Sequence, residues 1–148
     1  MSVKPEPKSG IRVACYDDAL HREAVIVMWK NVFGYDNATN EPSCSIDRKM
    51  AHHDDLMFVA CSEEMTVGTI MAGYDGHRGW LYSLAVLPEY RVKGIGSELV
   101  RHAEQALEKL GCVKINLQIL ESNSDVVGFY ESLGYSVEPR ISMGKRVV

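Results

Sequence analysis

The sequence predicts an α/β fold, in which one mixed, mostly antiparallel central sheet carries helices on both faces. Three apolar runs of strand length follow one another between residues 56 and 87, separated by polar turns, which is typical of antiparallel hairpins. Longer segments on either side of these runs carry apolar residues at helical spacing. The predicted order of elements is β-α-α-β-β-β-α-β-α-β-β, and no internal repeat divides it.

The length and composition suit one domain. A chain of 148 residues can bury roughly 68–70% of its unfolded surface in a single core. A content of 46% hydrophobic and 24% charged residues is an ordinary globular mixture. We expect residues 1–10, rich in Lys, Pro, Ser and Gly, to form a disordered leader, and residues 11–148 to form a single domain.

Several classes of protein are not indicated. The net charge of −4 is spread along the chain, so no basic stripe indicates nucleic-acid binding. No run of about 18 apolar residues predicts a membrane span, and the first residues lack an apolar signal segment, so we expect a cytoplasmic protein. The four cysteines show no C-x-x-C spacing. Adjacent residues of the "HHDD" stretch, 52–55, would point to different faces of a helix, so we expect no metal.

The first third of the chain predicts one strand and two helices. Residues 11–16 alternate and include β-branched side chains, which favours a strand. The two aspartates that follow can each cap a helix, and Gly34 ends that helix. After a long polar loop, Ser45 can cap a short helix over residues 46–53.

The middle of the chain predicts three strands and a long amphipathic helix. The strands are the runs 56–61, 66–74 and 79–87, and Pro88 ends the last of them because proline cannot donate to a central ladder. From Ile95 to Leu110 the apolar residues form one helical stripe. The next residue is a glycine, which we expect to end the helix in a left-handed conformation.

The last third predicts a buried strand over residues 113–120 and a short helix over residues 122–134. The segments 135–139 and 142–147 are predicted as the final two strands.

The stretch "RVKGIG", residues 91–96, joins a predicted strand to a predicted helix. A Rossmann fingerprint would need a third small residue where Leu99 stands, and a phosphate-binding P-loop would need a lysine after the glycines. A simple tight turn remains an alternative. A glycine-rich turn that enters a helix also leaves several N–H groups pointing one way, and glycine lets a diphosphate approach them. Arg91 and Lys93 could add positive charge.

With its flanks, "LAVLPEYRVKGIGSELV" resembles the acyl-CoA-binding motif of the GNAT superfamily of N-acetyltransferases, Arg/Gln-x-x-Gly-x-Gly/Ala. Downstream, "NSDVVGFYESLGY" is similar to the second motif of that superfamily, an Asn followed by a Tyr. The order of elements also matches the GNAT fold over residues 11–146. The compact length and "GYDGHRG" further resemble small stand-alone bacterial acetyltransferases of the YpeA type.

The resemblance implies a binding site for acetyl-CoA as cosubstrate. The backbone of the strand would contact the pantetheine arm, and the amides of the turn would surround the pyrophosphate. Asn123 would contact the cofactor, with a helix N-cap as the alternative. The implied cofactor-binding residues are Leu84, Ala85, Val86, Arg91, Val92, Lys93, Gly94, Ile95, Gly96, Ser97, Asn123 and Tyr130.

The resemblance also implies catalytic residues. It puts the hydroxyl of Tyr130 beside the sulfur of CoA, and a phenol of pKa near 10 can protonate a thiolate whose thiol has a pKa near 8.5. His77 is the candidate base, whereas Asp75 also suits a turn. N-terminal acetyltransferases of ribosomal proteins carry a glutamate on the strand before the Asn motif. This chain has Gln118 there, which cannot accept a proton.

The expected function is therefore N-acetylation of a primary amine by direct attack on acetyl-CoA through a tetrahedral intermediate. The acceptor is either a small-molecule amine or a protein amine. Glu41, Asp47 and Asp54 could favour a cationic amine or could simply be solvated. The alternative function is a non-catalytic acyl-CoA-binding regulator. Homodimers are common in the superfamily, although no feature of this sequence specifies one.

Overall fold

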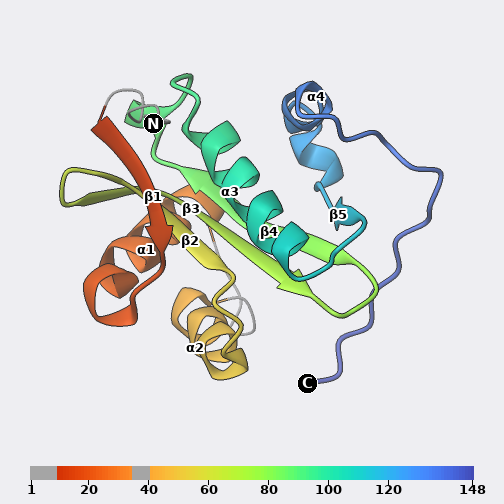
Figure 1. Cartoon of the computed structure of the whole chain (residues 1–148), viewed down its shortest axis with the longest axis horizontal. Coiled ribbons are helices and arrows are strands. Elements are labelled where there is room, and N and C mark those ends of the chain that lie inside the picture. The colour runs from red at the N-terminus through yellow and green to blue at the C-terminus, as the bar shows by residue number, and fades with distance from the viewer. Residues whose placement is uncertain (1–9, 35–40) are drawn as a thin grey trace, which may run out of the picture. The chain divides into compact units, whose positions relative to one another are not determined.

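Five strands form one sheet in the computed structural model, which describes residues 10–34 and 41–148 (Figure 1). Neighbours in the sheet follow the chain order, β1-β2-β3-β4-β5. The first four strands pair antiparallel, and β4 pairs with β5 in parallel. The predicted α/β class with a mixed, mostly antiparallel sheet is thus confirmed. The strands are β1 (Ile11–Cys15), β2 (Met57–Ser62), β3 (Met65–Tyr74), β4 (Gly79–Val86) and β5 (Ile115–Leu117).

The chain divides into two compact units, one ending at Leu117 and the other beginning at Gln118. The first unit holds the whole sheet with α1 (Asp18–Phe33), α2 (Pro42–His52), α3 (Ile95–Lys109) and the 3-10 turn η2 (Pro88–Tyr90). The second holds the 3-10 turn η3 (Glu121–Asn123) and α4 (Val126–Ser132). A single domain over residues 11–148 stays a prediction, as does the disordered leader, of which residues 1–9 lie outside the described residues.

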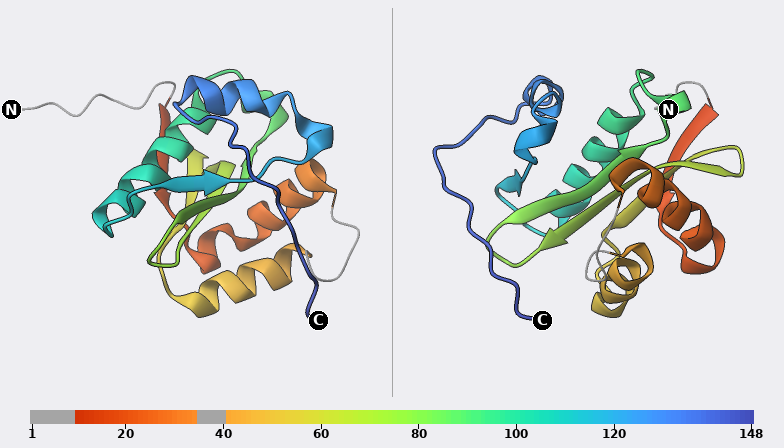
Figure 2. Two further views of the ribbon diagram at one scale, coloured as in Figure 1. Left: turned by 90° about the vertical axis from the view of Figure 1, so that its right-hand side faces the viewer. Right: turned by 180° about the vertical axis from the view of Figure 1, so that it is seen from behind.

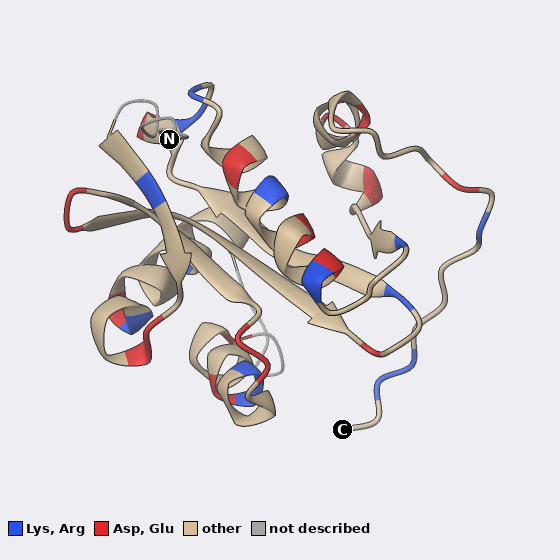
Figure 3. Ribbon diagram, viewed as in Figure 1, with Lys and Arg blue, Asp and Glu red and all other residues tan. Residues whose placement is uncertain are grey.

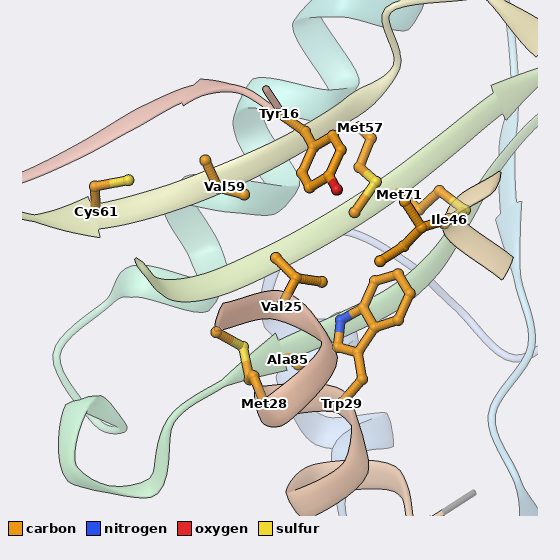
Figure 4. Packing of buried hydrophobic residues seen from close by; sticks show 10 residues of the cluster. All are labelled: Tyr16, Val25, Met28, Trp29, Ile46, Met57, Val59, Cys61, Met71 and Ala85. Atoms are coloured by element: carbon orange, nitrogen blue, oxygen red, sulfur yellow. The ribbon is translucent and has the colours of Figure 1, made fainter. Parts of the chain in front are cut away.

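Helices cover both faces of the sheet, with α3 on one face and α1 and α2 on the other (Figures 1 and 2). Strand β2 contacts helices on both faces of the sheet, because successive side chains of a strand point to opposite faces. Phe58 makes an edge-on ring contact with His102 of α3 at 4.7 Å between centroids. Its neighbours Met57 and Val59 belong to the buried cluster that includes Trp29 of α1 (Figure 4).

Helix α1 begins and ends as its sequence predicts. The side chain of Asp17 accepts a hydrogen bond from the N–H of Leu20 at 3.2 Å, and Gly34 closes the helix with a φ of 59°. Helix α3 is likewise confirmed, and Gly111 follows it with a φ of 89°. These signals are reliable because each cap is satisfied by residues within one turn of it.

Helix α2 begins earlier than predicted. Its N-cap is Glu41 rather than Ser45, and Pro42 occupies the first helical position, where its missing N–H costs nothing. The carboxylate of Glu41 accepts hydrogen bonds from the N–H groups of Ser43 and Cys44. Glutamate is not among the strongly preferred N-cap residues, so the pattern alone pointed to the later serine.

The N-cap Glu41 predicts that the stability of the folded protein depends on pH. Hydrogen bonds from the hydroxyl and N–H of Ser43 and from the N–H of Cys44 lower the pKa of Glu41 from 4.5 to about 2. A lowered carboxyl pKa stabilises the fold above the unfolded value and is lost as the pH falls through the folded value. We expect the melting temperature of Glu41→Gln to lie below that of the parent protein at pH 7, with the gap closing between pH 4.5 and about 2. Glu64→Gln, in the turn between β2 and β3, is the control. A gap that is the same at both ends of this range would contradict the role of Glu41.

The C-terminal predictions are wrong in detail. The strand predicted at 113–120 is reduced to β5, and the predicted helix 122–134 is divided into η3 and α4. The two final strands at 135–139 and 142–147 are not formed, because residues 135–148 contain no strand. Their apolar side chains, Val137, Ile141 and Met143, are largely exposed. Alternation predicts a strand only where a partner pairs with its backbone, and the local pattern does not contain that partner.

No helix within the described ranges is both long and apolar enough to cross a bilayer.

Candidate functional site

Strand β4 contains a β-bulge near its middle. The register between β3 and β4 shifts between Thr69 and Met71, so β4 carries one extra residue opposite β3. At this point Ser83 has a φ of 52°, in the left-handed region. Such bulges bend a strand, leave a residue unpaired and are frequent beside functional sites.

Two buried side chains hold this bulge. The hydroxyl of Thr69 donates to the carbonyl of Ser83 at 3.1 Å and accepts from Nε1 of Trp29 at 2.8 Å. Thr69 and Trp29 are completely buried, and Trp29 lies on α1 among the core residues (Figure 4). A buried polar chain with every member satisfied is rigid, so α1 orients the carbonyl at the bulge.

Beyond the bulge, one edge of β4 has no neighbouring strand in the described sheet. The parallel pairing with β5 covers three residues of β4 and ends where Leu81 meets Leu117. The pairing with β3 continues to Val86. The residues predicted to contact pantetheine, Leu84 to Val86, therefore lie on a strand edge that an extended ligand can join through main-chain hydrogen bonds.

Arg91 connects the end of β4 to the turn that follows. Its Nε donates to the carbonyl of Val86 at 3.0 Å, while the arginine itself remains exposed. The sequence suggested Arg91 only as a source of positive charge. In the structure it also fixes the turn onto the strand.

The turn between η2 and α3 has an unusual backbone. Val92 has a φ of 63° and Gly94 a φ of 81°. A left-handed conformation is rare for a β-branched residue, and such strain persists mainly where the surroundings require it. The side chain of Val92 is fully exposed, and the ammonium of Lys93 lies 5.4 Å from the ring centre of Tyr90.

The N-terminus of α3 follows directly. Gly94 is its N-cap and offers no side-chain hydrogen bond, and the N–H of Glu98 donates to the carbonyl of Gly94 at 3.1 Å. The N–H groups of the first three helical residues, Ile95 to Ser97, precede this bond and form the positive end of the helix dipole. Figure 3 shows basic positions in the turn leading into α3. This arrangement is typical of a phosphate-binding site.

Tyr130 lies on α4 in the second unit. Its ring makes edge-on contacts with Phe129 at 5.0 Å and Tyr135 at 5.7 Å between centroids. Burial raises the pKa of Tyr130 to about 12. The phenol is therefore protonated throughout the neutral range.

Asn123 does not cap α4. It ends η3 and is exposed, with its N–H donating to the carbonyl of Leu120 at 2.8 Å, whereas the N-cap of α4 is Asp125. The N-cap interpretation of Asn123 is therefore wrong. So is the expectation that it shares one α-helix with Tyr130, because Asn123 ends the 3-10 turn η3 and α4 begins only at Val126.

Asp75 and His77 lie in the turn that joins β3 to β4. The carboxylate of Asp75 accepts from the N–H groups of Arg78 and His77, both at 2.7 Å, and these bonds lower the pKa of Asp75. The turn interpretation of Asp75 is thus confirmed. His77 is exposed. A strand rises about 3.3 Å per residue, so Gly79 and Ser83 alone are about 13 Å apart, and the structure does not bring His77 to the bulge.

Sequence reasoning missed the residues that hold the bulge. The hydroxyl of Thr69 within a mostly apolar strand was the available signal, but its partners lie on another strand and on a helix. Among the residues that the structure describes, no three His, Cys, Asp or Glu side chains converge as metal ligands.

The sequence is similar to those of known acetyltransferases. The sequence profile of the acetyltransferase (GNAT) family matches residues 22–135. An acetyltransferase of Pectobacterium atrosepticum is 41% identical over 138 residues, covering 93% of this chain and 95% of the relative. An acetyltransferase of Yersinia pestis (strain Pestoides F) is 38% identical with the same coverage.

Solved structures share the fold at lower identity. The aminoglycoside N-acetyltransferase AAC(6')-Iy in complex with CoA superposes with a TM-score of 0.77 at 16% identity, covering 99% of this chain and 100% of the other. The PaiA N-acetyltransferase of Thermoplasma acidophilum, in complex with coenzyme A, has a TM-score of 0.75 at 22% identity, covering 88% and 92%.

Proposed function

Because the chain belongs to the acetyltransferase (GNAT) family and is an acyltransferase, as its resemblance implied, we propose that it transfers an acetyl group from acetyl-CoA to a primary amine. The observation that carries the proposal is the left-handed turn at the N-terminus of α3, which follows the open-edged strand β4 after the short turn η2. In the proposal, the amides of residues 92–97 bind the pyrophosphate and the edge of β4 from Leu84 to Val86 binds the pantetheine arm. That two solved GNAT relatives were determined with CoA supports the choice of donor.

The proposed reaction is direct transfer. The amine nitrogen attacks the thioester carbonyl, a C–N bond forms, and the C–S bond breaks as the tetrahedral intermediate collapses. The nitrogen loses a proton, and CoA leaves as a thiolate that gains one. His77 stays a prediction as the base; its separation from the bulge means that it would act through water.

Tyr130 is the proposed donor to the departing sulfur. A phenol of pKa about 12 is a poor proton source for a thiolate whose thiol has a pKa near 8.5, because complete transfer would cost about 5 kcal/mol. The same phenol is always protonated at neutral pH and can donate a hydrogen bond to the developing negative charge. We therefore assign it stabilisation of the leaving thiolate rather than obligatory protonation.

The decisive experiment combines calorimetry with a thiol-release assay. The protein should bind acetyl-CoA and release CoA in the presence of at least one amine from a panel of amino acids, amino alcohols, polyamines and peptides. Acetyl-CoA binding without turnover on any amine would favour the non-catalytic regulator. The absence of binding would refute both functions.

The bulge can be tested with Thr69→Val, which keeps the shape of the side chain and removes its hydroxyl. The indole N–H of Trp29 would be left buried without its acceptor, so we expect a loss of about 1–3 kcal/mol in the free energy of unfolding. Release of the Ser83 carbonyl should also lower kcat by roughly threefold or more, since the bulge borders the reacting group in the proposed site. Thr66→Val, at the start of β3, is the control. An unchanged kcat at temperatures where the variant is fully folded would contradict a positioning role.

A further inference from the structure

An open hollow of about 520 Å³ lies between α2 and the bulged part of β4. This volume is in the usual range for small-molecule sites, about 300–1,000 Å³. Two of its lining residues, Tyr82 and Ser83, lie at the bulge. The hollow therefore borders the place where the proposed acetyl group would react. The lining consists of Ser45, Arg48, Lys49, His52, Met71, Tyr82 and Ser83.

His52 carries the only imidazole among the lining residues that the structure describes. It lies in the last turn of α2, two helical turns after Ser45, which lines the same hollow. The side chain of His52 is 68% exposed, so a bound amine or a water molecule can reach its ring nitrogens. Imidazole is the commonest general base in enzymes. The hollow thus places a candidate base beside the bulge.

The adjacent histidine belongs to a different part of the surface. His53 is the C-cap of α2 and has a left-handed φ of 52°. It lines a second hollow of about 90 Å³, together with Tyr16 and Met57. The two imidazoles therefore differ in position although they are neighbours in the sequence, and His53 provides a matched control for His52.

A carboxylate lies beside the imidazole of His52. Oδ2 of Asp54 is 3.9 Å from Nε2 of His52 and accepts a hydrogen bond from the ammonium of Lys49 at 2.7 Å. Oδ1 of Asp54 accepts from the N–H of Leu56 at 3.1 Å. Lys49 also donates to the carbonyl of Ala72 on β3, so this carboxylate is fixed to the sheet. A base that a third, fixed group orients is a recurring arrangement in enzymes that activate nucleophiles.

Other ionisable groups also surround His52. From α2, the segment after it and β4, they are Arg48, Lys49, Asp54 and Tyr82. Burial, with a smaller contribution from the charge of Asp75, raises the pKa of Tyr82. Arginine, lysine and carboxyl side chains ordinarily titrate outside the range from pH 5 to 8, whereas imidazole titrates within it. A pH effect in this range that requires His52 would therefore report on its imidazole.

We propose that His52 is the general base of the acetyl transfer. Nε2 keeps its hydrogen towards Asp54, and Nδ1 accepts the proton that the amine nitrogen loses as the C–N bond forms, either directly or through one water molecule. The C–S bond breaks as the tetrahedral intermediate collapses, and the imidazolium then gives its proton to the departing thiolate. This inference rests on the proposed acetyl transfer, and it assigns the role of base to His52 in place of His77, which lies away from the bulge.

The test compares the pH dependence of His52→Gln and His53→Gln. Glutamine can form hydrogen bonds but cannot accept a proton near neutral pH. We expect His52→Gln to lower kcat/KM for the amine roughly tenfold or more at pH 8. The ratio of parent to variant should fall towards one at pH 5, because a protonated imidazole cannot act as a base, and the ratio cancels the titration of the amine itself. His53→Gln should keep the parent profile at temperatures where both variants are folded.

The outcomes separate this inference from the proposed function. The absence of thiol release by the parent protein with any amine would refute the transfer itself. Thiol release with a ratio for His52→Gln that is the same at pH 5 and pH 8 would overturn only the base, since a structural defect would give such a ratio. A pH-dependent ratio for His77→Gln, with a constant one for His52→Gln, would also overturn it.

A binding measurement gives a second readout. In NMR spectra of the acetyl-CoA complex with ¹⁵N-labelled histidine, an amine that the protein acetylates should shift the imidazole signals of His52 and leave those of His53 in place. The absence of a shift at His52 would overturn the inference.

Discussion

Replacing Tyr130 with phenylalanine should lower kcat by roughly tenfold or more while leaving the Kd for acetyl-CoA nearly unchanged. The substitution keeps the aromatic ring and its contacts with Phe129 and Tyr135 but removes the hydroxyl that would stabilise the departing thiolate. Stopped-flow or steady-state thiol release gives kcat, and calorimetry gives the Kd. Tyr74→Phe, which removes a hydroxyl from the end of β3, is the control.

The pH dependence sharpens this prediction. Burial raises the pKa of Tyr130 to about 12. At any pH well below that value the phenol is protonated and can donate a hydrogen bond. Between pH 7 and 9, kcat of the parent protein should therefore show no loss attributable to this phenol, and Tyr130→Phe should lower the whole profile without changing its shape. Equal turnover in the two proteins would remove Tyr130 from the mechanism. A fall in kcat near pH 9 that disappears in the variant would contradict the raised pKa.

Gly94→Val should weaken acetyl-CoA binding by roughly tenfold or more. The effect should come from a change in backbone conformation, because the new side chain would not clash with any neighbour. Gly94 has a φ of 81°, and no atom lies within 4 Å of where its Cβ would be. An L-residue held in the left-handed region costs about 1–2 kcal/mol, so the turn would relax and redirect the amides of Ile95 to Ser97. The Kd from calorimetry measures the change.

Gly76→Val is a matched control for Gly94→Val. Gly76 has a φ of 88° with the same open surroundings, but it lies in the turn between β3 and β4. The two variants should lose similar stability, measured as the free energy of unfolding, whereas only Gly94→Val should lose acetyl-CoA affinity. If both variants bound acetyl-CoA as tightly as the parent protein, the turn before α3 would not be the pyrophosphate site.

Local signals predicted much of this fold. Asp17, Gly34 and Gly111 act within one turn of the helices they begin or end, so their meaning does not depend on distant residues. Apolar runs with polar turns likewise predicted the β2-β3-β4 hairpins. The prediction failed where a partner decides the outcome: residues 135–147 alternate like strands but form none, and α2 starts at a proline capped by a glutamate.

The proposed site also has one part that the sequence predicted and another that only the tertiary structure revealed. Gly94 adopts a left-handed φ directly before α3, a conformation that glycine favours. The resemblance of this stretch to the GNAT acyl-CoA motif was enough to suggest the donor. The bulge depends on a Trp29–Thr69 bond that spans 40 positions in the chain. Side chains so far apart in sequence meet only when the helices pack on the sheet, so the hydrogen bonds that hold the bulge emerged only from the tertiary structure.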